Sequence, residues 1–119
     1  MPIDNKKYDL EERTAKFGED VIVFVKSIKV NEVNRPLISQ SVRSATSIGA
    51  NYVEADGGVS KKDFRNKIGI CKKEAKETKH WLRMMSKANP EKVEECRKLW
   101  KETHELVLIF SKIYNNSKE

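Results

Sequence analysis

One residue spacing in this sequence is typical of metal-binding helical bundles, namely Glu77-x-x-His80. A di-metal centre of that kind needs the same pair on two helices and a glutamate from each of the other two. A second pair is missing, because Lys101 stands three positions before His104. On a helical wheel, Glu77 and His80 also point more than about 120° away from the apolar stripe of their own helix. We therefore expect no metal site.

Other patterns of catalytic chemistry are also missing from the sequence. There is no G-x-x-x-x-G-K-[ST] or G-x-G-x-x-G phosphate-binding loop, and two histidines leave few candidates for acid or base catalysis. Cys71 and Cys96 form no C-x-x-C pair and lie on apolar faces, which favours reduced cysteines that act as core residues. The sequence therefore predicts a protein that is not an enzyme and holds no cofactor.

Positive charge is the strongest functional signal. Residues 61–87 contain eight Lys and two Arg against three acids, a net charge of +7, whereas the whole chain carries +6. On a helical wheel, five of these cations cluster within about 60° of one another, away from the acids. We call them the basic stripe: Arg65, Lys72, Lys76, Lys79 and Arg83. The stripe indicates either a polyanion-binding surface or an ordinary solvated face. Aromatic residues are not interleaved with it, so any nucleic-acid contact should be to phosphates, without sequence preference.

Four helices must position these residues. Apolar residues at alternating spacings of three and four predict helices over about 9–29, 35–55, 61–87 and 90–114. Asn34, Ser60 and Asn89 stand where N-caps are expected, and Gly57-Gly58 end the second helix. Because the connections are short, we expect one all-α domain over residues 1–119, an antiparallel up-down-up-down four-helix bundle.

Each helix has an expected core stripe. In the first helix it is Leu10, Thr14, Phe17, Val21, Phe24 and Ile28, and in the second Ile38, Val42, Ala45, Gly49 and Tyr52. In the third it is Phe64, Ile68, Cys71, Ala75, Thr78, Leu82 and Met85, and in the fourth Val93, Cys96, Trp100, Thr103, Val107, Phe110 and Tyr114. Small residues crowd the second helix, which favours tight packing either within the chain or between subunits.

The fourth helix carries more apolar surface than one seam requires. Such a wide apolar arc is buried either by the other three helices or by another subunit, and we favour the second. Two residues on the third helix that lie off the main stripe are candidates for the same interface. The predicted interface residues are Leu99, Leu106, Ile109, Ile113, Ile70 and Trp81.

The composition is 38% hydrophobic and 35% charged, with few Gly and Pro, which is typical of long helices. No apolar run approaches the roughly 18 residues that a membrane span needs, and the first ten residues do not resemble a signal peptide. We expect a cytoplasmic protein that does not enter the membrane.

The second and third helices carry a recognisable block of residues. It consists of Arg43-Ser44-x-x-Ser47-Ile48-x-x-Asn51-x-x-Glu54-Ala55, Ser60-Lys61-Lys62-Asp63-Phe64 and Lys73-Glu74-Ala75-x-Glu77-Thr78-x-x-Trp81-Leu82. The block resembles the bacterial four helix bundle protein family, also called the 23S rRNA-intervening sequence proteins. These are similar to the accessory variability protein of diversity-generating retroelements.

The resemblance implies an antiparallel bundle, a homopentameric ring, a basic surface, and binding to nucleic acid and to a reverse transcriptase. Arg43, Ser47 and Glu54 share one face of the second helix, directed away from its core stripe. We expect them to contact a neighbouring helix or a subunit.

Together these features favour a non-catalytic homo-oligomer that binds the backbone of RNA or DNA through the basic stripe. The alternative is a protein-interaction adaptor or structural protein, for example one that docks a reverse transcriptase without binding nucleic acid itself.

Overall fold

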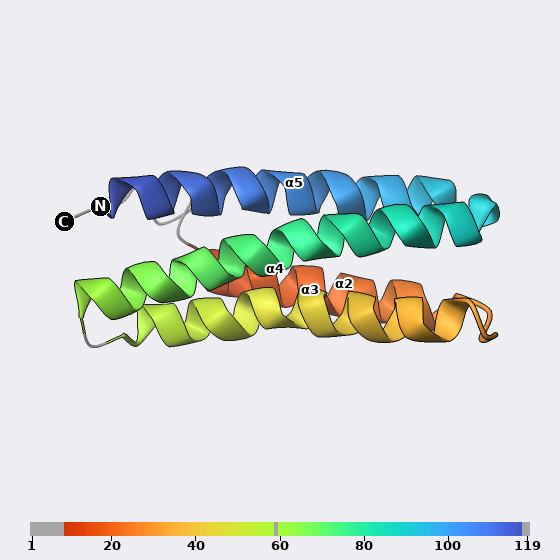
Figure 1. Ribbon diagram of the computed structural model, residues 1–119, viewed down its shortest axis with the longest axis horizontal. Coiled ribbons are helices and arrows are strands. Elements are labelled where there is room, and N and C mark those ends of the chain that lie inside the picture. The colour runs from red at the N-terminus through yellow and green to blue at the C-terminus, as the bar shows by residue number, and fades with distance from the viewer. Residues whose placement is uncertain (1–8, 59, 118–119) are drawn as a thin grey trace.

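The computed structural model describes residues 9–58 and 60–117 and is elongated, with extents of 46 × 25 × 19 Å. Four long antiparallel helices run along it (Figure 1), and a single 3₁₀ turn precedes the last. The elements are α2 (Leu10–Lys26), α3 (Asn34–Asp56), α4 (Lys61–Ala88), η1 (Pro90–Lys92) and α5 (Val93–Asn116). No strand occurs within these two ranges. The predicted all-α, up-down-up-down four-helix bundle is confirmed.

The helix ends follow local hydrogen bonding. α4 begins as predicted, because the Ser60 hydroxyl oxygen accepts a hydrogen bond from the Asp63 backbone N–H at 3.1 Å. α2 ends at Lys26, three residues earlier than predicted. The Ser27 hydroxyl and its backbone N–H both donate to the Phe24 carbonyl oxygen, at 2.6 and 3.0 Å, which tightens and closes the last turn.

Asn89 stands at the N-cap position of η1 with Pro90 after it, as predicted, although its side chain makes no capping hydrogen bond. The prediction that Asn34 is an N-cap is wrong. α3 already includes Asn34, whose backbone N–H donates to the side chain of Asn31 at 2.7 Å. Instead, the buried side-chain amides of Asn34 and Asn89 donate to each other, at 2.9 Å in both directions. The α2–α3 and α4–α5 connections lie at the same end of the bundle (Figure 1), so this Asn clasp ties the two connections together.

The expected core stripe of the first helix is entirely buried, as is that of the third except for the partly buried Phe64. The other two stripes need correction. In α3, Ile48 is fully buried in the position expected for Gly49, and in α5 Leu106, which is predicted as an interface residue, is fully buried. A central helix such as α3 packs against two neighbours, so its buried arc is wider than one seam and differently centred.

Small residues of α3 allow close packing within the chain. Ser41, Ser44 and Ala45 are buried, and a Cβ added to Gly49 would lie 3.2 Å from the Thr14 hydroxyl oxygen. A larger residue at this position would crowd Thr14, so glycine favours the close approach of α2 to α3. Part of this small-residue face therefore packs inside the chain, whereas Ser39 and Ala50 are exposed.

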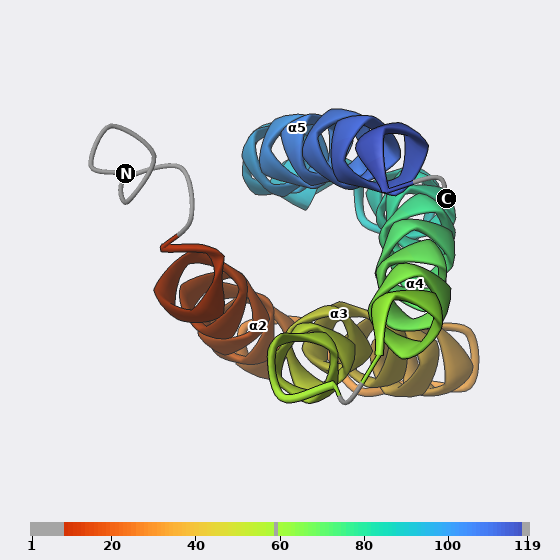
Figure 2. The same cartoon turned by 90° about the vertical axis from the view of Figure 1, so that its left-hand side faces the viewer.

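The four helices do not close into a ring. α3 packs against α2 and α4, and α4 packs against α5, but α2 and α5 make little contact with each other. Viewed from one end, the helices trace an open arc with α2 and α5 at its two edges (Figure 2). This leaves α5 with one flank packed on α4 and the other facing a groove.

Candidate nucleic-acid interface

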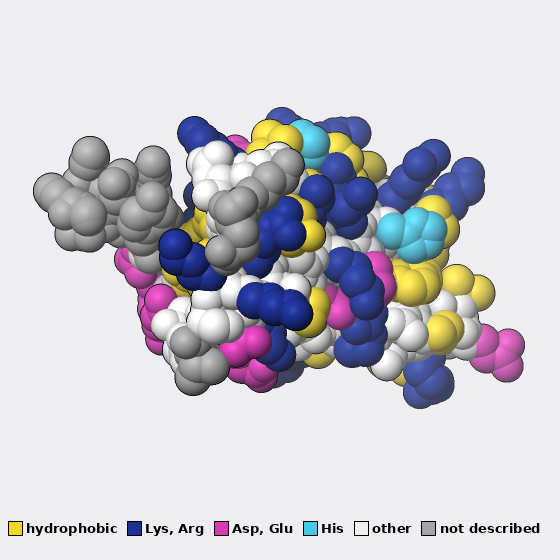
Figure 3. All heavy atoms as spheres, turned by 60° about the vertical axis from the view of Figure 1, so that its left-hand side comes forward, with side chains coloured by type: hydrophobic (Ala, Val, Ile, Leu, Met, Phe, Trp, Pro, Cys, Tyr) yellow, Lys and Arg dark blue, Asp and Glu magenta, His cyan; other side chains and the backbone are white. Residues whose placement is uncertain are grey.

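The basic stripe runs along the outer side of α4. Lys76 and Arg83 are exposed, while Arg65, Lys72 and Lys79 are partly buried. Lys and Arg side chains spread across the face shown in Figure 3, with histidine side chains among them. Each stripe residue therefore keeps surface that is open to solvent, as the helical wheel predicts.

The acidic residues of α4 are directed to the other flank, where α3 uses them. Arg43 of α3 donates to Glu74 at 3.2 Å and also to Glu77, while Glu54 of α3 pairs with Lys67 at 2.5 Å. The predicted contact of Arg43 and Glu54 with a neighbouring helix is therefore confirmed. The Ser47 hydroxyl instead donates to a carbonyl of its own helix. Two glutamates of α4 are thereby unavailable to neutralise the stripe.

The stripe residues have no carboxylate partner among residues 9–58 and 60–117. No ion pair within these ranges joins any of the five to an acid. Unpaired cations that share one helix face repel one another, which costs a few tenths of a kcal/mol per pair. A bound polyanion would remove this repulsion.

Arg65, at one end of the stripe, is held by α5. Its guanidinium lies 3.8 Å from the centre of the Tyr114 ring, and its Nε donates to the Tyr114 carbonyl oxygen at 3.3 Å. The ring approaches α4 closely at Gly69, where an added Cβ would lie 3.1 Å from the Tyr114 Cε1. Arg65 therefore satisfies the carboxyl end of α5, where a positive charge is favourable.

Lys79, in the middle of the stripe, is also engaged by α5. Its Nζ lies 2.9 Å from His104 Nδ1 and 4.5 Å from the centre of the Trp100 ring. Since the ammonium donates, His104 Nδ1 is the acceptor and its proton is on Nε2. The His104 ring stacks on Trp100 at a centroid distance of 5.3 Å and an interplanar angle of 8°. An aromatic pair therefore lies directly beside the stripe.

Beyond Lys79 the seam opens into a cavity of about 360 Å³, lined by both helices. Its apolar lining includes Leu82 of α4 and Cys96 and Trp100 of α5. Arg83, Arg97 and Lys101 also line it, and all three are exposed. We call this the Trp100 pocket.

The predicted oligomer interface is only partly available. Leu99, Ile109, Ile113, Ile70 and Trp81 are partly buried, so each still has exposed surface. Leu106 is fully buried within the protomer and is not an interface residue. Leu108 is instead 56% exposed on α5, because α5 is rotated so that Leu106 and Phe110 face the core.

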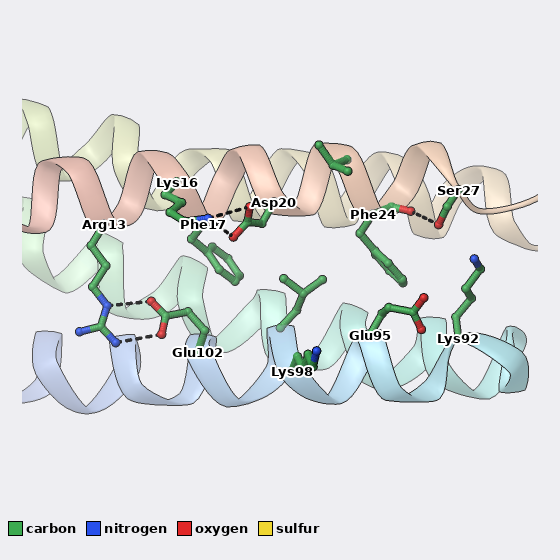
Figure 4. Close-up of a pocket in the computed structure, with 12 residues that line it drawn as sticks. Arg13, Lys16, Phe17, Asp20, Phe24, Ser27, Lys92, Glu95, Lys98 and Glu102 are labelled. Atoms are coloured by element: carbon green, nitrogen blue, oxygen red, sulfur yellow. Dashed lines mark hydrogen bonds and ion pairs between the residues drawn. The ribbon is translucent and has the colours of Figure 1, made fainter.

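The other flank of α5 faces α2 across a groove of about 680 Å³ (Figure 4). Phe17 and Phe24 of α2 point toward it (Figure 4). Arg13 spans the groove at one end and donates to Glu102 at 2.7 and 2.9 Å and to Glu105 at 2.8 Å. The hydrogen bonds to Glu102 raise the pKa of Arg13 above its ordinary value. Acidic and basic residues alternate along this groove, in contrast to the basic stripe.

Both cysteines are free and buried in the core, as predicted. Burial raises the pKa of the Cys71 thiol to about 12 and that of the Cys96 thiol to about 11. Both thiols are therefore protonated at neutral pH.

Glu77 and His80, which have the spacing of a metal-binding pair, have other partners. Glu77 pairs with Arg43, and His80 lies edge-on to Trp81. Over the described ranges, no three His, Cys, Asp or Glu side chains form a cluster that could hold a metal ion.

Comparison with known proteins places the chain in a family. A family model described as 23S rRNA-intervening sequence protein matches residues 6–112. The chain belongs to this family. The family membership predicted from the block on α3 and α4 is confirmed.

A crystal structure from Bacteroides thetaiotaomicron is similar to this chain, with a TM-score of 0.76 and 29% sequence identity. The match covers 87% of this chain and 96% of the other, which is described as a protein of unknown function from the S23 ribosomal protein family. Among curated proteins, no relative matched. The part of the chain that the structure describes contains no helix long and apolar enough to cross a membrane.

Sequence reasoning missed the contribution of α5 to the basic side of the bundle. Trp100 and His104 are one helical turn apart, as are Arg97 and Lys101, so the spacing of each pair was visible in the sequence. A wheel drawn for one helix at a time does not give the rotation of α5 against α4. That rotation decides which aromatic residue lies next to the stripe.

Proposed function

We propose that this protein binds RNA or DNA through phosphate contacts along the basic stripe, without sequence preference. The observation that carries the proposal is the charge segregation on α4. Glu74 and Glu77 pair with α3, whereas Lys72, Lys76 and Arg83 have no carboxylate partner among the described residues. Long-range attraction between such a surface and a polyanion supplies affinity that carries no base information.

The stripe residues differ in how freely they reach a phosphate. Arg65 and Lys79 already contact α5, so Lys72, Lys76 and Arg83 are the best candidates for direct contacts. Each phosphate neutralised on duplex DNA contributes about −0.9 to the slope of log affinity against log salt. Changing these three residues to Gln should flatten the slope by about 2 to 3 per protomer and weaken binding to all sequences equally.

Salt titrations with duplex DNA and RNA test this proposal. The matched control is Lys26→Gln, Lys29→Gln and Lys98→Gln, which removes the same charge from exposed positions outside the stripe. Both triple variants should stay folded, because surface substitutions usually change stability by no more than about 0.5 kcal/mol. Equal slopes for the two variants would show that the stripe is an ordinary solvated face.

The second candidate is a role in assembly, as a homo-oligomer, with a pentamer favoured, or as an adaptor that docks a protein partner such as a reverse transcriptase. Exposed apolar residues support it, since Val23 is 69% and Leu108 is 56% exposed. Light scattering at micromolar concentration should give a mass that is a multiple of the mass of one chain. The double variant Leu108→Lys with Ile113→Lys should have a lower mass than the wild type. A wild-type monomer would contradict oligomerisation. Failure of the wild type to retain RNA or DNA in a gel shift would leave the adaptor role.

A further inference from the structure

The Trp100 pocket differs from the rest of the basic side because it combines an aromatic ring, an apolar wall and a cationic rim. Its volume of about 360 Å³ lies within the roughly 300–1,000 Å³ of small-molecule sites. Leu82 and Cys96 are buried behind it, so the wall is part of the core and is preformed. An apolar recess of this size, open to solvent and edged by cations, suits a ligand in which a flat ring is joined to an anionic group. The ring would enter the recess and the anionic group would contact the cations.

The Trp100 ring is held in place before any ligand arrives. His104 stacks on it with an interplanar angle of 8°, and the Lys79 ammonium lies 4.5 Å from its centroid. Lys79 is itself fixed by its 2.9 Å contact with His104 Nδ1. A ring that is already oriented loses little conformational entropy when a second ring stacks against it.

Three cations surround the pocket at the end of the basic stripe. Arg83 comes from α4, and Arg97 and Lys101 come from α5. Arg97 forms one exposed pair, with Glu94 at 2.8 Å. Pairs of this kind contribute little in water, so a phosphate readily replaces the carboxylate. The rim therefore presents cations from two helices to a backbone that passes along the stripe.

We infer that the Trp100 pocket binds an unpaired nucleobase, which stacks on Trp100 while the flanking phosphates contact Arg83, Arg97 and Lys101. This inference rests on the proposed nucleic-acid binding and names the form of nucleic acid preferred. A paired base is stacked on both sides within its helix, whereas a base in a single strand or a bulge is free to stack on an aromatic residue. The protein should therefore prefer single strands and bulges to uninterrupted duplexes.

Fluorescence of Trp100 tests the inference without altering the pocket. Trp81→Phe leaves Trp100 as the single tryptophan, because the chain contains two. Three RNA ligands are compared: a duplex with one bulged adenosine, the same duplex with an abasic residue in the bulge, and the uninterrupted duplex. The same three ligands made of DNA show whether the protein distinguishes RNA from DNA. The bulged adenosine should quench Trp100, whereas the abasic bulge, which has the same phosphates, should not.

A substitution at the pocket provides the second measurement. In wild type, the bulged adenosine should bind about 5- to 150-fold more tightly than the abasic bulge, the range that corresponds to one base stacked on an aromatic ring. Trp100→Leu should remove that preference and leave the affinity for the uninterrupted duplex and its salt slope unchanged. Trp100→Phe, which keeps an aromatic ring, should retain part of it.

The outcomes separate this inference from the proposed function. Equal quenching and equal affinity for the base and the abasic bulge would overturn base stacking while salt-dependent binding stands. Loss of bulge and duplex binding together in Trp100→Leu, with circular dichroism unchanged, would likewise overturn it. Absence of salt-dependent binding to every ligand would reject the proposed function, and the inference with it.

Discussion

The two flanks of α5 contrast in packing and in charge. Toward α4, the helix is packed continuously, and its outer edge adds Arg97, Lys101 and Trp100 to a surface rich in cations. Toward α2, it faces a groove in which acidic and basic residues alternate, and Arg13 bridges that groove to Glu102 and Glu105.

The comparison shows that the basic surface and the open side of the bundle belong to different helix pairs. The basic surface lies beside the α4–α5 seam, and the groove lies between α2 and α5. The α3–α4 and α4–α5 seams are the most closely packed of the molecule, and the basic stripe lies on α4 between them. Across the α2–α5 side, Arg13 forms partly exposed ion pairs with Glu102 and Glu105, beside a groove whose lining includes Phe17 and Phe24. A surface that recognises a polyanion benefits from rigid support, whereas a groove bridged by exposed ion pairs responds to salt and to partners.

The largest effect should come from Leu106, which faces the packed side. Leu106→Ala removes a fully buried side chain and should lower the free energy of unfolding by about 2–5 kcal/mol. Leu108→Ala, two residues along the same helix but 56% exposed, should change it by about 0.5 kcal/mol or less. Urea denaturation compares the two variants. Similar losses would contradict the orientation of α5.

The buried thiols give a smaller effect that depends on pH. Cys71 and Cys96 have pKa values of about 12 and 11 in the folded chain, against 9.0 for an unperturbed thiol. Below pH 9 both states keep the protons, so these groups give no pH dependence. Above pH 9 only the unfolded chain releases them, and stability falls as pH rises toward the folded pKa values.

At pH 10 the expected loss is about 1 kcal/mol per thiol relative to pH 8. Urea denaturation at the two pH values, for wild type and for Cys71→Ala with Cys96→Ala, measures it. The double variant should be less stable at both pH values, because each Cys→Ala substitution leaves a small cavity in the core. Its free energy of unfolding should nevertheless fall less between pH 8 and pH 10 than that of the wild type. An identical alkaline loss in both proteins would show that water reaches the thiols.

The smallest effect should come from Arg13, on the groove side. Arg13→Gln breaks partly exposed ion pairs and should cost about 1 kcal/mol or less at low salt, and less still at high salt. Hydrogen exchange should speed up in α2 more than in α4. Lys16→Gln is the matched control, because Lys16 pairs only with Asp20 of its own helix among the described residues. Faster exchange in α4 than in α2 would contradict the contrast between the closely packed α4 and the edge helix α2.

Much of the fold could be predicted from the sequence because local signals agree with one another. Gly57-Gly58 and the Ser60 cap mark the start of α4, and the stripe from Ile68 to Met85 is buried as the period of 3.6 residues requires. Features that depend on the relative orientation of two helices could not be predicted from the sequence. The burial of Leu106, the Asn clasp and the open arc each follow from how the helices rotate against one another.

The candidate site divides in the same way. That five cations share one face of α4 follows from their spacing, so the basic stripe could be predicted in full. The engagement of Arg65 by Tyr114 and of Lys79 by His104 could not, because it depends on α5. The role of the stripe in binding stays a prediction, and the salt titrations decide it.

The Asn clasp also has a mechanical consequence. It fastens the two connections at one end of the bundle, while Arg13 lies near the opposite end of α2, about 20 Å away at 1.5 Å per residue. The Asn34 side chain also donates to the Lys29 carbonyl oxygen at 2.8 Å, just beyond the carboxyl end of α2. Buried amides therefore hold the chain at that end of α2, whereas partly exposed ion pairs hold it near the other end, so added salt should loosen α2 from its amino end.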